Sequence, residues 1–213
     1  MNRKIFYSVA VAWLFVLTVR SQTAPATPEQ QKMMLGKIMG ASAGMGSMVC
    51  DFEQTKELSL LSEKIVSKGK MYYRKNGLLR WEYLTPYRYA FVLNGDKILM
   101  QTGNSRNVVD VRSNRFFQEL VKVMMSGVNG SGLTDARNFT SSYYAGDRKW
   151  KAVLVPVGKE MKQMFASIRL TFSVDDFTVD SVEMEEQNGD KTIIRLTDKK
   201  LNAEIDDTQF HID

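Results

Sequence analysis

The segment from Ser67 to Met100 alternates apolar and polar residues with a period of two, and this pattern restricts it to neighbouring β-strands. In its middle, Leu79, Trp81 and Tyr83 fall on one side of an extended chain, and the residues between them fall on the other. Successive side chains of a strand point to opposite faces, so one face is expected to be apolar and the other solvated. The segment offers an apolar surface and no catalytic group.

A second strand is predicted after a break at Pro86. Proline has no N–H to donate to a sheet, so residues 85–87 are expected to form a turn or to start an edge strand. The alternation resumes with Tyr89, Phe91 and Leu93. The same face is therefore predicted to continue onto the next strand.

A tight hairpin is predicted at Asn94-Gly95, because both residues adopt positive φ values readily. Ile98 and Met100 then continue the apolar face on the returning strand. Three strands within about thirty residues imply an antiparallel meander.

Two longer helices are expected outside this meander. Thr27, Pro28 and Gln30 provide a capping side chain, a proline at the first position and a capping-box partner for a helix. Four apolar residues near helical spacing follow, before glycines end the helix and a first strand begins at Met48: Met33, Met34, Ile38 and Met39. A second helix is predicted from Asn114 to Ser126, where apolar residues occur on all sides and Gly127 provides the stop.

The remainder of the chain reads as further strands. Their predicted ranges are 139–144, 150–155, 168–174, 179–187 and 191–196. Asn188-Gly189 indicates a second tight hairpin, a short helical segment is expected at 159–165, and a last strand is expected to end near Phe210. Many antiparallel strands with two or three helices and no repeated βαβ order predict an α+β fold.

The order of motifs resembles that of the periplasmic lipoprotein carrier family (LolA). The central run follows the pattern G-x-M-x-Y-x5-L-R-W-E-Y-x-x-P from Gly69 to Pro86. Upstream, residues 52–56 resemble the F-x-Q-x-K strand of the family, and downstream, residues 168–172, 182–190 and 201–210 resemble its closing segments. The resemblance covers roughly residues 30 to 212.

This resemblance implies an incomplete antiparallel β-barrel, that is a curved sheet, with helices that cover a hydrophobic cavity. Thirteen methionines fit this expectation, because the flexible, polarizable side chain of methionine adapts to ligands of irregular shape. The residues expected to form the lipid-binding cavity are Phe52, Met71, Tyr73, Leu79, Trp81, Tyr83, Tyr89, Phe91, Met100, Phe117, Leu120 and Met124.

The resemblance also implies a basic residue that clamps the lid of the cavity. Family members carry an arginine ahead of the tryptophan, usually followed by proline, and the matching positions here are Lys75 and Asn76. Lysine cannot form the two-pronged contact of a guanidinium, so either Lys75 or its neighbour Arg74 is expected to act as the clamp.

The first 21 residues have the layout of a secretory signal peptide. Arg3 and Lys4 precede an apolar run at 5–19, and small residues follow around Ser21. The run is shorter than the roughly 20 residues that a membrane-spanning helix needs, so cleavage after Ser21 is predicted in preference to an uncleaved anchor. Residues 22–213 are then expected to form a single periplasmic domain.

The net charge argues against nucleic acid as a partner, and the cysteine count excludes an intramolecular disulfide. Without the predicted signal peptide the chain has 26 basic and 24 acidic residues, so its net charge falls from +5 to +2. Nucleic acid is therefore not an expected partner. The basic cluster Lys68, Lys70, Arg74 and Lys75 is expected to occupy solvated positions of a strand and a turn. One cysteine, Cys50, excludes an intramolecular disulfide.

Enzyme chemistry is not expected. His211 is the only histidine and Cys50 the only cysteine. A zinc site needs several histidine or cysteine ligands, and a nucleophile–histidine pair would have to use His211, so neither kind of site is expected. The carboxylate pairs at 175–176 and 206–207 lie where turns are predicted, and solvated turn residues are the expected interpretation. No catalytic residue, metal or cofactor is predicted.

The resemblance implies a carrier that accepts the acyl chains of lipoproteins from an inner-membrane ABC-type extractor and passes them to an outer-membrane acceptor. It is expected to act as a monomer. Two alternatives remain open. One is a carrier for another lipid, such as a glycolipid or a lipid-linked polyketide intermediate, and the other is a lipid-binding sensor module that regulates a membrane partner.

Overall fold

The structure is a computed structural model, which describes residues 24–61, 63–113, 118, 121, 124–125, 128 and 130–212. The predicted signal peptide, residues 1–21, lies outside the described residues. So do most residues of the helix predicted from Asn114 to Ser126, and the glycine predicted to stop it. The described residues of that segment are helical, namely Gln118, Val121, Met124, Met125 and Val128.

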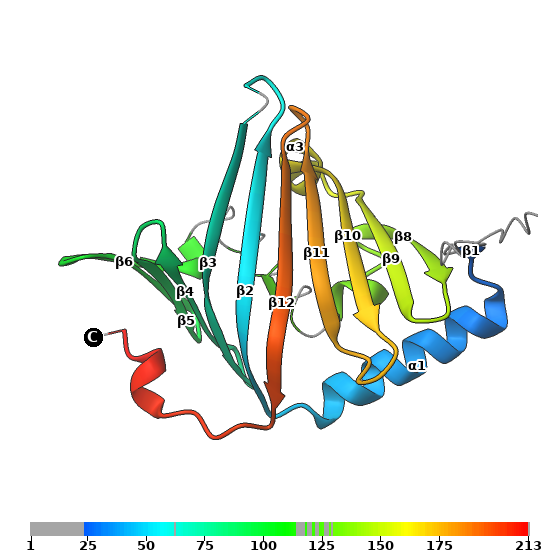
Figure 1. Cartoon of the computed structure of the whole chain (residues 1–213), viewed down its shortest axis with the longest axis horizontal. Helices are drawn as coiled ribbons and strands as arrows, with labels where there is room; N and C mark the ends of the chain where they lie inside the picture. Colours follow the sequence, from blue (N-terminus) through cyan, green and yellow to red (C-terminus); the bar gives the residue numbers. More distant parts are fainter. Residues whose placement is uncertain are drawn as a thin grey trace, which may run out of the picture.

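Twelve strands form one antiparallel sheet in the described part of the chain (Figure 1). Their order in the sheet is β1-β8-β9-β10-β11-β12-β2-β3-β4-β5-β6-β7. The bounds are β1 (Ala24–Pro25), β2 (Ser47–Leu58), β3 (Glu63–Arg74), β4 (Leu78–Thr85), β5 (Tyr89–Asn94), β6 (Lys97–Thr102), β7 (Ser105–Asp110), β8 (Phe139–Ala145), β9 (Lys149–Pro156), β10 (Phe165–Ser173), β11 (Val179–Glu186) and β12 (Lys191–Leu201).

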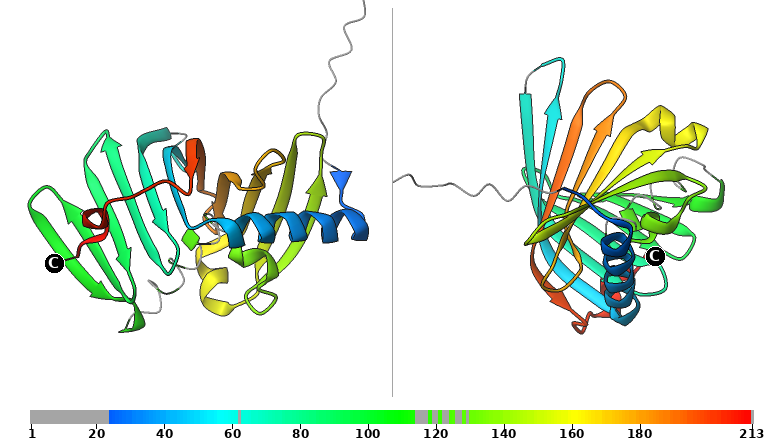
Figure 2. Two further views of the ribbon diagram at one scale, coloured as in Figure 1. Left: turned by 90° about the horizontal axis from the view of Figure 1, so that it is seen from below. Right: turned by 90° about the vertical axis from the view of Figure 1, so that its right-hand side faces the viewer.

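Pairing of β12 with β2 joins two meanders, one from each half of the chain. The sheet curls along its length and does not close, because β1 and β7 are its two edges (Figure 2). The predicted α+β class and the incomplete, curved antiparallel barrel are confirmed.

The helix α1 (Pro28–Gly44) begins as its sequence predicts. The backbone N–H of Gln30 donates to the hydroxyl of Thr27, and the backbone N–H of Thr27 donates to the side-chain oxygen of Gln30, which is a complete capping box. Only Met34 and Ile38 are buried against the sheet. Met33 and Met39, which were grouped with them by spacing, are exposed.

The shorter helical elements are η1 (Val111–Ser113), η2 (Ser131–Thr134), α3 (Lys159–Met164) and η3 (Asp207–Phe210). The prediction of a short helix at 159–165 is confirmed by α3. The prediction of a strand ending near Phe210 is wrong, because this residue ends η3. The side chain of Asp206 accepts the backbone N–H of Thr208 there, and this cap favours a helical turn over an extended chain.

The concave face of the sheet carries two buried apolar clusters. One lies between α1 and strands β8 to β11 and includes Trp150, Leu154 and Phe172. The other lies over strands β2 to β6 and includes Phe52, Met71 and Trp81, with Val128 from the helical segment packed against it. The apolar positions predicted by the alternation in β4 and β5 face this second cluster.

The opposite, convex face differs from the solvated surface that the alternation predicted. Val92 and Leu99 point to this face and are almost fully buried under Ile205 and Phe210 of the C-terminal segment. This segment is fixed by hydrogen bonds from the Asn94 side chain to the carbonyl of Phe210 and from Arg74 to the carbonyl of Ile205. A strand pattern cannot reveal that a distant segment covers its polar side.

Both predicted hairpins exist, but their turns differ from the prediction. Asn94 pairs with Lys97, so the turn residues are Gly95 and Asp96, and only Gly95 has a positive φ, of 58°. Glycine at the first central position is sufficient for this hairpin. At the second site β11 and β12 are joined by residues 187–190, a longer loop than a two-residue turn.

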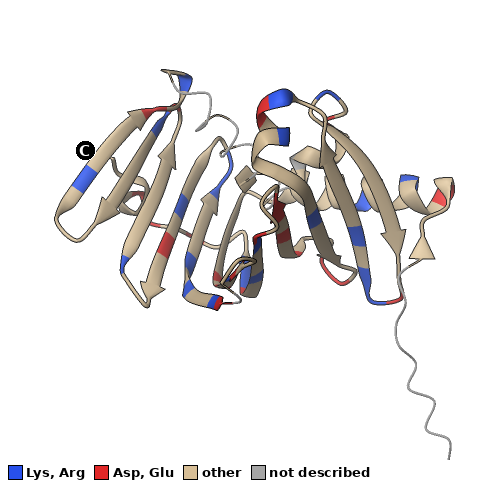
Figure 3. Ribbon diagram, turned by 90° about the horizontal axis from the view of Figure 1, so that it is seen from above, with Lys and Arg blue, Asp and Glu red and all other residues tan. Residues whose placement is uncertain are grey.

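Charged residues of both signs are interspersed along the strands instead of gathering in one area (Figure 3). Lys68 pairs with Glu53 at 2.9 Å and Lys70 pairs with Asp51 at 2.7 Å across β2 and β3. Lys68 and Lys70 therefore occupy the solvated strand positions expected for the basic cluster, whereas Arg74 differs from this expectation because it contacts the C-terminal segment. Among the described helices, none is long and apolar enough to cross a membrane.

Candidate functional site

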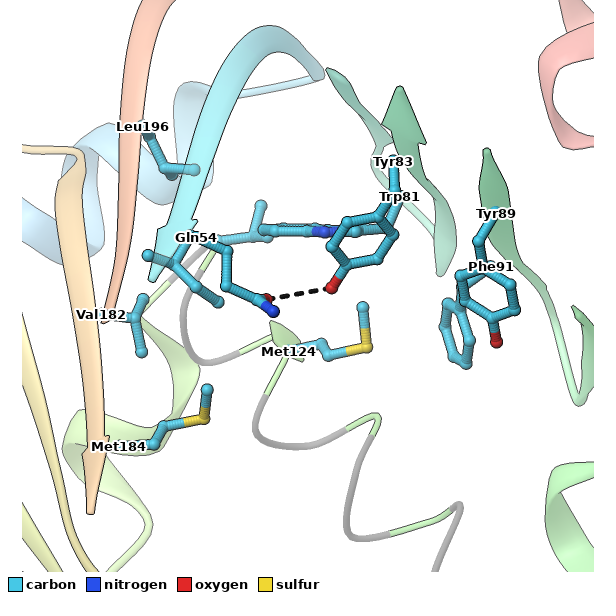
Figure 4. Close-up of a pocket in the computed structure, with 11 residues that line it drawn as sticks. Gln54, Trp81, Tyr83, Tyr89, Phe91, Met124, Val182, Met184 and Leu196 are labelled. Atoms are coloured by element: carbon cyan, nitrogen blue, oxygen red, sulfur yellow. Dashed lines mark hydrogen bonds between the residues drawn. The ribbon is translucent and has the colours of Figure 1, made fainter. Parts of the chain in front are cut away.

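A cavity of about 250 Å³ lies on the concave side of the sheet, under the helical segment that carries Met124 (Figure 4). Its described lining contains no charged side chain. The lining residues are Gln54, Trp81, Tyr83, Tyr89, Phe91, Met124, Val128, Val182, Met184, Ile194 and Leu196.

One wall of the cavity consists of aromatic residues from β4 and β5. Trp81 pairs with Phe91, and Tyr83 pairs with Tyr89, across the two strands. Because side chains of directly paired residues lie on the same face of a sheet, these four rings are neighbours. The ring centroids of Tyr83 and Tyr89 are 6.0 Å apart.

The opposite wall consists of aliphatic residues and one methionine from β11 and β12. Val182 pairs with Ile194, and Met184 and Leu196 extend the same face by one step on each strand. β12 then pairs with β2, where Ile194 lies opposite Gln54. The two walls are therefore joined by β2 and β3, and the cavity depends on pairing between the two halves of the chain.

Phe52 of β2 packs against the aromatic wall. Its ring centroid lies 4.4 Å from that of Trp81 and 5.1 Å from that of Tyr83. Phe52 pairs with Gly69 of β3, and a Cβ atom on Gly69 would lie 2.6 Å from the Phe52 ring and 1.9 Å from the backbone oxygen of Glu82. Glycine at this position thus allows the ring to cover the strand and to reach Trp81.

The cavity contains one polar pair. The hydroxyl of Tyr83 donates to the side-chain oxygen of Gln54 at 2.9 Å (Figure 4). Burial raises the pKa of both Tyr83 and Tyr89 above the ordinary value for a phenol, and for Tyr83 it outweighs the opposing effects of Trp81 and Gln54. Both side chains are therefore neutral at physiological pH, and the site provides hydrogen bonds without charge.

Cys50 and the paired aspartates have no catalytic arrangement in the described part of the chain. Burial raises the pKa of Cys50 to about 12, so its thiol is protonated and unreactive at neutral pH. Asp176 and Asp206 each accept a backbone N–H two residues further on, as turn residues do. No group of three or more potential metal ligands is found among the described residues.

The twelve residues predicted for the cavity fall into three groups. Five line it, namely Trp81, Tyr83, Tyr89, Phe91 and Met124. Five pack in the apolar cluster behind the lining, namely Phe52, Met71, Tyr73, Leu79 and Met100. Phe117 and Leu120 lie outside the described residues.

Six lining residues were missed by the sequence reasoning: Gln54, Val128, Val182, Met184, Ile194 and Leu196. The period of two in segments 179–187 and 191–196 places four of these on common strand faces. It does not indicate which face turns towards a cavity. Gln54 lies two residues after Phe52, on the same face, and this spacing is the signal that could have found it.

The two candidate clamp residues lie on different sides of the sheet. The Lys75 ammonium donates to the carbonyl of Ala43 at 3.1 Å, in the last turn of α1, where a cation also complements the helix dipole. Arg74 instead contacts the C-terminal segment on the convex face, through Asp207 and the ring of Phe210. Of the two, Lys75 alone contacts a helix on the cavity side.

The chain also resembles proteins of known sequence. An outer-membrane lipoprotein carrier protein of Chromohalobacter salexigens is 24% identical over 208 residues, which is 98% of this chain and 92% of that protein. The outer-membrane lipoprotein carrier protein of Pseudomonas aeruginosa is 25% identical over 145 residues, which is 68% of this chain and 66% of that protein.

Solved structures share the fold at low sequence identity. An uncharacterized conserved protein from Thermus thermophilus matches with a TM-score of 0.53 and 12% identity, over 84% of this chain and 91% of that chain. The complex of MucA and MucB from Pseudomonas aeruginosa matches with a TM-score of 0.52 and 12% identity, over 85% of this chain and 60% of that chain.

The family model described as outer membrane lipoprotein carrier protein LolA matches residues 43–213. This range includes every strand of the sheet except β1. The match therefore includes both walls of the cavity, as well as the C-terminal segment. The chain belongs to the LolA family of outer membrane lipoprotein carrier proteins.

Proposed function

We propose that this protein is a periplasmic carrier that binds the acyl chains of lipoproteins and shields them between the inner and the outer membrane. The observation that carries the proposal is the uncharged cavity on the concave face, in a chain of the LolA family. Its walls are aromatic and aliphatic, and burial of an acyl chain is worth about 0.8 kcal/mol per methylene group. Release and uptake are then governed by relative affinities, and no covalent bond is made or broken.

The proposed carrier takes its cargo from an inner-membrane ABC-type extractor and delivers it to an outer-membrane acceptor. Residues 1–21 would direct it to the periplasm and be removed there, and residues 22–213 would act as a monomer. Lys75 is the proposed clamp, because its contact with Ala43 ties the end of α1 to the β3–β4 turn. Arg74 is assigned to the attachment of the C-terminal segment.

The test is release of newly made lipoproteins from spheroplasts of the source bacterium by the purified mature protein. One-to-one soluble complexes in the supernatant are the expected result. Met184→Glu places a carboxylate in the apolar wall and should abolish release, because an unpaired charge against an acyl chain is costly. Ser181→Glu is the matched control, since it adds the same charge to the opposite face of β11.

Other cargo gives a different result in the same assay. If lipoproteins remain on the membrane and native mass spectrometry of the protein finds a glycolipid or a lipid-linked polyketide, the lipoprotein assignment is wrong and the cavity serves that lipid. If the protein instead binds lipid and associates stably with one membrane protein, it acts as a sensor module.

A further inference from the structure

Gln54 is the residue that an apolar cavity does not explain. It lies on β2 on the same face as Met48, Cys50 and Phe52, all of which are nearly fully buried. Gln54 itself is partly buried, so its amide loses part of its hydrogen bonding to water, and this loss disfavours the position unless partners replace it. A cavity that only shelters hydrocarbon would be served better by leucine or methionine here.

The hydrogen bond with Tyr83 satisfies only one end of the amide. The Tyr83 hydroxyl donates to the side-chain oxygen of Gln54, and this arrangement leaves the amide nitrogen as a donor. In Figure 4 this nitrogen lies at the end of the side chain, on the side of Met124, and no dashed line ends on it. Within the described part of the chain, no acceptor binds it.

A second donor in the same wall lacks a partner. Trp81 is only 7% exposed, and its indole N–H lies close enough to the Tyr83 hydroxyl to lower the pKa of that group, but it makes no hydrogen bond of good geometry in the described structure. Trp81 lines the cavity beside Tyr83. Leaving a buried donor unpaired is unfavourable, and most buried donors in proteins are paired.

The lining thus has an excess of uncharged N–H donors. No carboxylate lies in the described lining to attract a cation, and no lysine or arginine lies there to attract an anion. The complementary ligand group is a neutral acceptor that is attached to hydrocarbon. The carbonyl oxygen of an acyl ester or amide is such an acceptor. A saturated hydrocarbon chain has no acceptor, and an ether oxygen is a weaker acceptor than a carbonyl oxygen.

We propose that the cavity recognises the carbonyl group of an acyl ester or amide, and not hydrocarbon alone, through the N–H donors of Gln54 and Trp81. This inference rests on the proposed binding of acyl chains and specifies what selects them. Tyr83 is a positioning residue, because its hydroxyl holds the Gln54 oxygen and so orients the amide nitrogen. The aliphatic wall of β11 and β12 remains available for the chain.

The experiment compares two ligands that differ in one group. Methyl hexadecanoate and methyl hexadecyl ether have chains of equal length, but only the ester has a carbonyl. Each displaces diphenylhexatriene, a neutral fluorescent hydrocarbon, from the purified protein, expressed from its full-length sequence. The wild-type protein should bind the ester about five- to tenfold more tightly than the ether, as expected for one net hydrogen bond.

Two variants assign the preference to the donors. Gln54→Leu and Trp81→Phe each remove an N–H group and keep an apolar side chain, and each should reduce the preference for the ester while binding of the ether is retained. Gln101→Leu is the matched control. It removes an amide from β6, where the alternation of Ile98 and Met100 towards the core places Gln101 on the other face.

Equal binding of the two ligands by the wild-type protein would overturn the inference, and so would a preference that survives in both variants. Either result leaves the proposed carrier function intact, because the ligands still bind. Failure of both ligands to bind the wild-type protein would refute the carrier function itself, together with this inference.

Discussion

Replacement of Gly69 by alanine should destabilise the protein through the contact of Gly69 with Phe52, which supports the aromatic wall of the cavity. The new Cβ atom would lie 1.9 Å from the backbone oxygen of Glu82 and 2.6 Å from the Phe52 ring. The ring can rotate away, but the oxygen belongs to the neighbouring strand. β3 and β4 must therefore separate by roughly 1 Å near this position, to restore a tolerable contact.

The expected loss follows from two contributions. Overpacking of a well-packed site costs about 1–3 kcal/mol, and each weakened ladder hydrogen bond adds about 1 kcal/mol. The free energy of unfolding should thus fall by about 3 kcal/mol, a large part of the roughly 5–15 kcal/mol that is typical of a folded domain. Displacement of Phe52 should also change the emission of Trp81, whose ring it contacts.

Urea unfolding followed by tryptophan fluorescence and circular dichroism measures the change. Gly36→Ala is the matched control, because Gly36 lies within α1 and no atom is within 4 Å of its would-be Cβ. This control should gain up to about 1 kcal/mol from helix propensity. If Gly69→Ala unfolds within about 0.5 kcal/mol of the wild type, the usual spread for neutral substitutions, the reasoning is refuted.

Two further predictions concern groups outside the cavity. Burial raises the pKa of Cys50 from 9.0 to about 12. Between these pH values the folded state keeps a proton that the unfolded state loses, so the free energy of unfolding should fall by about 1.4 kcal/mol per pH unit. Urea titrations at several pH values should show this slope between pH 9 and 10 in the wild type but not in Cys50→Ala. Above pH 10 both proteins should also lose stability, because burial raises the pKa of Tyr83 and Tyr89 above 10.0, so the test is the difference between the two curves; parallel curves throughout would contradict the assignment. Arg74→Ala should release the C-terminal segment from the convex face. The free energy of unfolding should fall by about 1–2 kcal/mol, and amide exchange at 203–212 should become faster. Arg88→Ala, at an exposed position, is the control and should change neither quantity. Unchanged exchange in Arg74→Ala would show that apolar packing and the Asn94 hydrogen bond hold this segment without Arg74.

Much of the sheet was predictable because the signals are local. The alternation through Trp81 and Tyr83 predicted the face that lines the cavity, and the capping box at Thr27 predicted the start of α1. One local signal was overlooked. Asn76 and Gly77 both have positive φ values in the β3–β4 turn, of 74° and 83°, and this Asn-Gly pair is a better turn signal than the one at 94–95.

Other features were not predictable from local patterns. Strand β7 has mostly exposed residues and little apolar alternation, so its sequence resembles that of a loop. It forms because β6 offers an unpaired edge, and the pairing of Ile98 with Val109 is a property of two strands together. The choice between Arg74 and Lys75 likewise depends on which face of the sheet each side chain reaches.

The sequence by itself determined the strand faces, the first helix, the turns near glycine and the absence of an obvious catalytic set, since each follows from residues a few positions apart. Only the tertiary structure decided that β12 joins β2, that Val182 and Met184 face Trp81 across a cavity, and that Ile205 and Phe210 cover the convex side. The physical reason is that burial of apolar surface is non-directional. An alternating strand specifies that one face must be covered, but the partner that covers it is selected by the packing of the whole chain.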